Sequence, residues 1–276
     1  MSRHPGRSPV LRFDSKESFQ ISLPNCNTRP HPRRPDLSVV VLCYRAGERT
    51  RQVAASVTAA LTSHGIASYQ LVLVGNYVAG ADDVTPAIVR DLAAHDERIV
   101  CSAAAKRGMM GWDMRSGLAL ADGEVLAVTD GDEQVAAGDV VRAYLALRRG
   151  GYDLVKAARV RRADGLARRL ISLVFNALFH LLFPGSRVRD VNAKPKVMTR
   201  AAYERLELTA DDWFIDAEVM IQARRLGLRT GEIETDFLAL AGRRSFIDLR
   251  TLVEFLVNLA RYRWRETARR DAPRER

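Results

Sequence analysis

The chain has 276 residues, of which 47% are hydrophobic and 28% charged. This composition excludes a wholly disordered or collagen-like protein and is sufficient for one large α/β domain or two small ones. The three cysteines form no CxxC pair and, with five scattered histidines, exclude a structural zinc framework. The net charge is +10, and residues 142–169 hold nine Lys/Arg against two acidic residues. Such a basic stretch inside a folded domain favours phosphate binding.

Residues 1–36 are rich in Pro, Arg and Ser and predict a disordered basic arm. They contain no apolar run typical of a secretion signal, and the longest apolar stretch, residues 170–183, is too short to span a membrane. We therefore expect a cytoplasmic protein, and the sequence leaves open its attachment to the inner face of the plasma membrane.

Short apolar runs alternate with helical patterns between residues 37 and 128. The β-branched run Leu37–Cys43 is typical of a buried parallel strand. Further strands are predicted at 71–74, 99–101 and 125–128, with helices at 48–64, 85–95 and 114–121. This βαβα alternation predicts an α/β fold, in which helices flank a mostly parallel sheet.

The second half of the chain is predicted to be mainly helical. One more strand is expected at 153–156, and helices at 139–149, 168–183, 212–226 and 246–264. We assign residues 37–245 to the folded domain and 246–276 to an amphipathic helix with an Arg-rich tail. That last helix is typical of a membrane surface, and also of a helix packed on its own domain.

The acidic turn behind the strand at 125–128 is the most informative segment. Asp130 and Asp132 are two residues apart, so in extended chain their side chains point the same way, and Gln134 keeps this parity. Mg²⁺ or Mn²⁺ prefers a few carboxylates completed by substrate phosphates. Ligands of an open parallel sheet bind beyond the carboxyl ends of its strands. The pattern predicts a metal site of Asp130, Asp132 and Gln134, unless the segment is a plain polar turn.

In its context this turn resembles the D-x-D-x-Q motif of family 2 glycosyltransferases, near the branch of dolichyl-phosphate-mannose synthases and polyprenyl-phosphate glycosyltransferases. The other segments that carry the resemblance are Tyr44-x-x-x-Glu48, Trp213-Phe-Ile-Asp216-Ala-Glu218 and Arg243-Arg244-Ser245. It covers about residues 37–260. The resemblance implies the GT-A fold and an inverting, metal-dependent transfer of a sugar from a UDP- or GDP-sugar.

The resemblance also implies which residues bind the donor. We expect this role for Tyr44, Glu48, Asn76, Asp83, Lys106, Asp130, Arg243 and Arg244. Lys106 lies in a glycine-punctuated loop before a helix, where free N–H groups can hold a diphosphate. Asn76 follows Gly75, where the family often has two adjacent Asp, and Arg45 stands where Asn is frequent. These departures leave the nucleotide open.

Polyprenyl phosphate is the acceptor that the resemblance favours, with Arg159, Arg168, Ser172 and Lys194 expected to bind it. Lys194 and Lys196 flank Pro195 and would neutralise phosphates, or else lie on an exposed strand edge. We assign catalytic roles to Asp132, Asp216 and Glu218.

An ionised phosphate acceptor needs no strong base, which leaves Asp216 to orient the acceptor. A saccharide hydroxyl would need Asp216 or Glu218 as general base. The sequence is also compatible with a sugar-nucleotide nucleotidyltransferase and with a non-enzymatic basic protein at a membrane surface. Nucleic acid is not an expected partner, because no basic–aromatic module appears.

Overall fold

The computed structural model describes residues 34–162, 166–185, 188–237 and 256–264. Residues 1–33 of the arm predicted at 1–36, the segment Arg243-Arg244-Ser245 and most of the Arg-rich tail lie outside these ranges. The expected helix at 246–264 is described only from residue 256, and residues 256–264 are helical.

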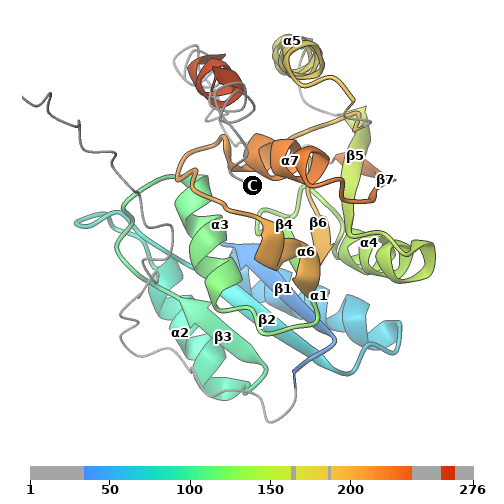
Figure 1. Cartoon of the computed structure of the whole chain (residues 1–276). Helices are drawn as coiled ribbons and strands as arrows, with labels where there is room; N and C mark the ends of the chain where they lie inside the picture. The colour runs from blue at the N-terminus through green and yellow to red at the C-terminus, as the bar shows by residue number, and fades with distance from the viewer. Residues whose placement is uncertain (1–33, 163–165, 186–187, 238–255, 265–276) are drawn as a thin grey trace, which may run out of the picture.

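A seven-stranded sheet runs through the molecule (Figure 1). The strand order is β3 (Ile99–Ser102), β2 (Tyr69–Val74), β1 (Leu37–Leu42), β4 (Val125–Asp130), β6 (Lys196–Thr199), β5 (Leu154–Arg162) and β7 (Thr230–Phe237). The first four strands are parallel, and β6 runs antiparallel between β4 and β5. The predicted mostly parallel α/β sheet is confirmed.

Helices cover both faces of the sheet (Figure 1). On one face lie α1 (Arg49–Ser63), α2 (Thr85–His95) and α4 (Ala137–Gly150). On the other lie α3 (Met110–Ala119), α5 (Leu166–Leu182), α6 (Arg200–Arg205) and α7 (Ile215–Arg225). Side chains of a strand alternate between faces, so Val39 and Val41 join the first core and Val40 and Leu42 the second. No helix of the described ranges is long and apolar enough to cross a bilayer.

Three elements were not predicted, namely β6, α6 and β7. The elements β6 and α6 have only four and six residues, and β7 contains mostly polar residues, so none of the three shows the length or the apolar pattern by which a strand or helix is predicted. The expectation that Lys196 could belong to an exposed strand edge is wrong, because β6 lies inside the sheet and the Lys196 side chain is fully buried. The predicted helix at 212–226 begins at Ile215, since residues 211–214 form the turn before it.

Gly117 is where α3 approaches the sheet closely. A Cβ at this position would lie 2.7 Å from Val74 Cγ2 and closer still to Val40 Cγ1. The space above β1 and β2 therefore requires a residue without a side chain. Gly138, near the start of α4, provides a matched comparison because a Cβ there would meet nothing within 4 Å.

We expect Gly117→Ala to lower the free energy of unfolding by about 1–3 kcal/mol, because the added methyl group overpacks the core. Gly138→Ala removes a helical glycine without a clash and should change the same quantity by at most about 1 kcal/mol, in the stabilising direction. Urea unfolding monitored by circular dichroism measures both. Equal effects of the two substitutions would contradict the close packing of α3.

Candidate functional site at the carboxyl edge of the sheet

The carboxyl ends of β1 and β4 lie side by side in the sheet. From β1 the strand order continues to β2 on one side and to β4 on the other, and Leu42 pairs with Asp130 at this edge. Such a switch point is where open α/β sheets bind ligands. The backbone N–H of Gly131 donates to the carbonyl oxygen of Leu42 at 2.9 Å. A Cβ at Gly131 would lie 2.8 Å from that oxygen, so glycine lets the acidic turn close onto β1.

The acidic turn presents oxygen atoms at this edge. Asp130 ends β4 with its side chain 36% exposed. Asp132 is partly buried, and its Oδ1 accepts a hydrogen bond from the backbone N–H of Gln134 at 3.2 Å. In the part of the chain that the structure describes, no group of three or more His, Cys, Asp or Glu side chains is placed to hold a metal. The donor atoms fit a hard divalent cation that takes most of its ligands from substrate phosphates and water.

A buried cluster of charges adjoins Asp130. The ammonium of Lys194 lies 2.9 Å from Asp216 Oδ2 and 3.4 Å from Asp130 Oδ1, and Lys196 lies 2.6 Å from Asp216 Oδ1. Burial alone would lower the pKa of Lys194, but the two carboxylates raise it above its usual value. Burial likewise acts to raise the pKa of Asp216, but the two lysines hold it below its usual range. Burial lowers the pKa of Lys196 to about 8, against the attraction of Asp216, which acts to raise it.

Lys106 lies beside Tyr44, in the loop that follows β3. Its ammonium forms a short ion pair with Asp113 of α3 and lies 4.0 Å from the centroid of the Tyr44 ring. The Asp113 side chain is buried, and its Oδ1 accepts a hydrogen bond from Asn76 Nδ2 at 3.0 Å. Asp113 was not among the residues predicted for the site. Lys106 lies in the loop before α3 and Asp113 lies inside this helix, so no regular spacing in the sequence relates the two side chains.

Asn76 is engaged on both sides of its amide. Its Nδ2 donates to Asp113 and to Ser116, and its Oδ1 accepts from Ser102 Oγ at 2.8 Å and from the backbone N–H of Ala104 at 3.0 Å. Asn76 therefore joins the ends of β2 and β3 to α3.

Asp83 and Glu48 belong to the two loops that border this region. Asp83 Oδ1 accepts from Thr85 Oγ1 at 2.6 Å, and Thr85 Oγ1 accepts from the backbone N–H of Gly47 at 2.9 Å. This chain of hydrogen bonds ties the loop after β1 to the start of α2. Glu48 is exposed, directly precedes α1 and pairs with Arg51 at 3.2 Å.

On the expected acceptor side, Arg159 of β5 is fixed by Asp190. The guanidinium donates to both carboxylate oxygens, from Nε at 2.6 Å and from Nη2 at 2.8 Å. Ser172 lies on α5, partly buried, next to Asn176. Arg168 belongs to the same helix, while Arg243 and Arg244 lie outside the described residues.

Glu218, expected to be catalytic, is fully buried in α7. Its carboxylate accepts hydrogen bonds from the backbone N–H groups of Thr209 and Ala210, from Thr209 Oγ1 and from the Tyr262 hydroxyl, at 2.9–3.1 Å. Glu218 thus holds the 209–210 loop and the helix at 256–264 against α7.

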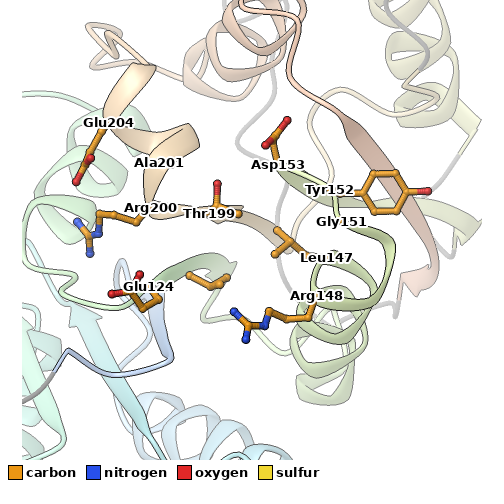
Figure 2. A pocket seen from close by; sticks show the side chains of 11 residues that line it. Glu124, Leu147, Arg148, Gly151, Tyr152, Asp153, Thr199, Arg200, Ala201 and Glu204 are labelled. Carbon is orange, nitrogen blue, oxygen red and sulfur yellow. The ribbon is translucent and has the colours of Figure 1, made fainter.

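A cavity of about 570 Å³ lies at the opposite edge of the sheet (Figure 2). It is lined by residues around the start of β4 and the end of β6, including Glu124, Thr199 and Arg200. The five residue steps of β4 separate it from Asp130 by roughly 16 Å. The Arg200 guanidinium donates to backbone carbonyls of the 121–123 turn and so holds this turn against the start of α6. This cavity is separate from the site at the carboxyl edge.

We expect Asp216→Asn to lower the free energy of unfolding by about 3–5 kcal/mol, because two buried ammonium groups lose their shared counter-charge. As the pKa of Asp216 is lowered in the fold, its stabilising contribution is present at neutral pH and is lost as the pH falls below about 4. The variant should therefore lose less stability on acidification. Urea unfolding at several pH values measures both effects.

Asp211→Asn is the matched control, since Asp211 forms an ion pair with Arg115 and its side chain is 48% exposed. This substitution should change the free energy of unfolding by no more than about 1 kcal/mol. Similar losses in the two variants would show that the buried cluster does not hold α7 to the sheet.

Comparisons with known proteins identify the family and the fold of this chain. Residues 38–206 match the family described as Glycosyl transferase family 2. Glycosyltransferase AglD of Haloferax volcanii is 30% identical over 223 residues, which are 76% of this chain and 35% of that protein. The chain thus spans about a third of the length of this curated relative.

Two solved structures share the fold at low sequence identity. Glucosyl-3-phosphoglycerate synthase of Mycobacterium tuberculosis, crystallised with Mn²⁺, UDP-glucose and phosphoglyceric acid, has a TM-score of 0.64 and 20% identity, and the match covers 85% of each chain. Mannosyl-3-phosphoglycerate synthase of Rubrobacter xylanophilus has a TM-score of 0.60 and 19% identity over 87% of this chain and 77% of that one. The expected fold and family are confirmed: with a match over more than half of its length, this GT-A-type α/β chain belongs to family 2 of the glycosyltransferases.

Proposed function

We propose that the chain is an inverting glycosyltransferase that transfers a sugar from a UDP- or GDP-sugar to a polyprenyl phosphate. The observation that carries this proposal is Asp130, a partly exposed carboxylate at the end of β4 and at the switch point of the sheet. Family membership supports the reaction class. The fold shared with a synthase that was crystallised with UDP-glucose and Mn²⁺ supports a nucleotide-sugar donor.

The donor would lie across the carboxyl ends of β1, β2 and β4. Tyr44 follows β1 and Lys106 follows β3, and the backbone N–H of Lys106 donates to the carbonyl oxygen of Tyr77 at 2.7 Å. In this position the Lys106 ammonium would bind a donor phosphate and Glu48 a donor hydroxyl. Asn76 and Asp83 would serve the donor by holding the loops that contact it. Arg243 and Arg244 remain proposed ligands of the leaving diphosphate.

Asp130 and Asp132, with Gln134, would hold a Mg²⁺ or Mn²⁺ ion together with the donor diphosphate. Such an ion, when bound, neutralises the negative charge that develops on the departing diphosphate. Lys194 fixes the inner oxygen of Asp130, and the fold leaves the carboxylate partly exposed on its outer side. The hydrogen bond from Gly131 to Leu42 holds the turn against β1, which supports this placement of the acidic side chains.

The state of Asp216 and Glu218 supports a phosphate as the nucleophile. Asp216 is buried between two lysines, and Glu218 is buried among hydrogen-bond donors. Neither carboxylate is placed to take a proton from a sugar hydroxyl. A phosphate oxygen is already ionised near neutral pH and can attack the anomeric carbon without a strong base. Asp216 then acts by positioning Lys194, in place of the general-base role.

Exposed apolar side chains support a lipid-linked acceptor. Leu173, Val174 and Leu181 of α5 are exposed, as are Val257 and Trp264 of the helix at 256–264. Figure 1 shows both helices at one end of the molecule, beyond α7. Apolar side chains next to basic residues are typical of a helix at a membrane surface. The polyprenyl chain would contact this end, and Arg159, with Arg168 and Ser172, would lie nearest its phosphate.

The donor can be identified by a thermal-shift panel of UDP- and GDP-sugars with and without Mn²⁺. One donor should raise the melting temperature only with the metal, by an amount that corresponds to about 2.7 kcal/mol at a ligand concentration of 100 Kd. Asp130→Asn should abolish the metal-dependent part. Asp122→Asn, an exposed acid at the other end of β4, should leave it unchanged. Donor stabilisation that is independent of metal would exclude the proposed role of Asp130.

The acceptor can be identified by sugar transfer to polyprenyl phosphate in vesicles and to phosphoglyceric acid in solution. We expect transfer to the lipid phosphate only. The double substitution Leu173→Ser/Leu181→Ser should lower the rate in vesicles about tenfold while leaving the rate in detergent unchanged, because detergent delivers the lipid without a membrane surface. Transfer to phosphoglyceric acid alone would refute the lipid acceptor.

A further inference from the structure

The Lys194 ammonium lies where three elements meet. It contacts Asp130 at the end of β4, Asp216 in the first turn of α7 and, at 3.3 Å, the sulfur of Met110 at the start of α3. The Lys194 side chain is only 2% exposed, whereas that of Asp130 is 36% exposed. The Asp130 carboxylate therefore has an inner side that meets a fixed cation and an outer side that meets the donor region.

The position of Lys194 follows from the direction of β6. Val128 of β4 pairs with Lys196, the first residue of the antiparallel β6, so the residues that precede β6 lie at the edge where β4 ends. Lys194 stands two residues before this strand, and its ammonium meets Asp130 there. The ion pair is thus built into the sheet edge.

The formal charges of the buried cluster and the adjoining Asp130 cancel. Lys194 and Lys196 balance Asp130 and Asp216, so the negative charge of Asp130 is already shared with an ammonium. When a divalent cation binds the outer side of Asp130, only the Asp130 carboxylate separates this cation from the Lys194 ammonium. Because protein interiors screen charge weakly, the two cations repel each other. A diphosphate that arrives with the metal supplies the missing negative charge.

We infer that Lys194 is a positioning residue that makes divalent-cation binding at Asp130 depend on the nucleoside diphosphate. This inference rests on the proposed function and deepens it. Lys194 holds the Asp130 carboxylate in place and keeps the free protein a poor metal site. The ion then enters with the donor and leaves with the nucleoside diphosphate, which couples metal release to product release.

The test measures the Kd of Mn²⁺ from the paramagnetic resonance of the free ion, for the chain alone and with saturating UDP or GDP. In the parent protein, one nucleotide should lower the Kd of Mn²⁺ at least about tenfold. Without nucleotide, Lys194→Met should lower the Kd of Mn²⁺ about tenfold relative to the parent protein. The ratio of the Mn²⁺ Kd without nucleotide to the Kd with nucleotide should therefore move toward one. By linkage, the factor by which Mn²⁺ raises nucleotide affinity equals this ratio, so it should be smaller in Lys194→Met than in the parent protein.

Two variants separate charge from folding. Lys194→Arg keeps the cation and should keep the ratio within about threefold of the parent. Lys156→Met removes another buried ammonium, one that pairs with Glu232 and not with Asp130, and should leave the ratio unchanged. If Lys194→Met does not fold, Lys194→Met/Asp216→Asn removes opposite charges together and takes its place in the same measurement.

An unchanged ratio in a folded Lys194→Met or double variant would overturn the inference, as would loss of the ratio in Lys194→Arg or an equal change in Lys156→Met. These outcomes leave the proposed function intact. If neither UDP nor GDP changes Mn²⁺ binding to the parent protein, the proposed donor and metal chemistry fails, and this inference fails with it.

Discussion

The buried attraction between Asp216 and two lysines is the interaction on which the site depends. Lys194 and Lys196 belong to the chain entering β6, and Asp216 belongs to the first turn of α7. Removing charges from water is costly, so the cluster is stable only while every member keeps its partner. That requirement fixes α7 against the sheet. Through Lys194 it also fixes Asp130, the residue that we propose to meet the donor diphosphate.

The parts of the molecule that could be predicted are those whose structure is determined by residues close together in the sequence. Runs such as Leu37–Leu42 identify buried strands because every residue but one is apolar, and α2 begins and ends where its pattern predicts. The acidic turn could be found because Asp130 and Asp132 lie close together at a strand end. The family and fold followed from the order of these motifs.

The rest of the site depends on contacts between residues far apart in the chain. Lys194 was predicted as an acceptor ligand, and Asp216 as a catalytic residue that orients the acceptor or acts as general base. No local pattern shows that the two side chains neutralise each other. Asp113 was missed because its role comes from Lys106 and Asn76, which the fold brings to it. The strand β6 was not predicted because its four residues include a lysine and are too few to show a strand pattern. Their burial depends on the neighbouring strands.

The antiparallel direction of β6 explains why a lysine can serve this edge. Parallel strands place only their carboxyl ends at a switch point, so each contributes residues that follow it in the chain. An antiparallel strand brings its amino end to the same edge, and with it the residues that precede it. Lys194, two residues before β6, therefore lies at the edge where β4 ends and reaches Asp130 there. Inserting one reversed strand into a parallel sheet thus brings a buried cation beside the carboxylate that we propose to hold the metal.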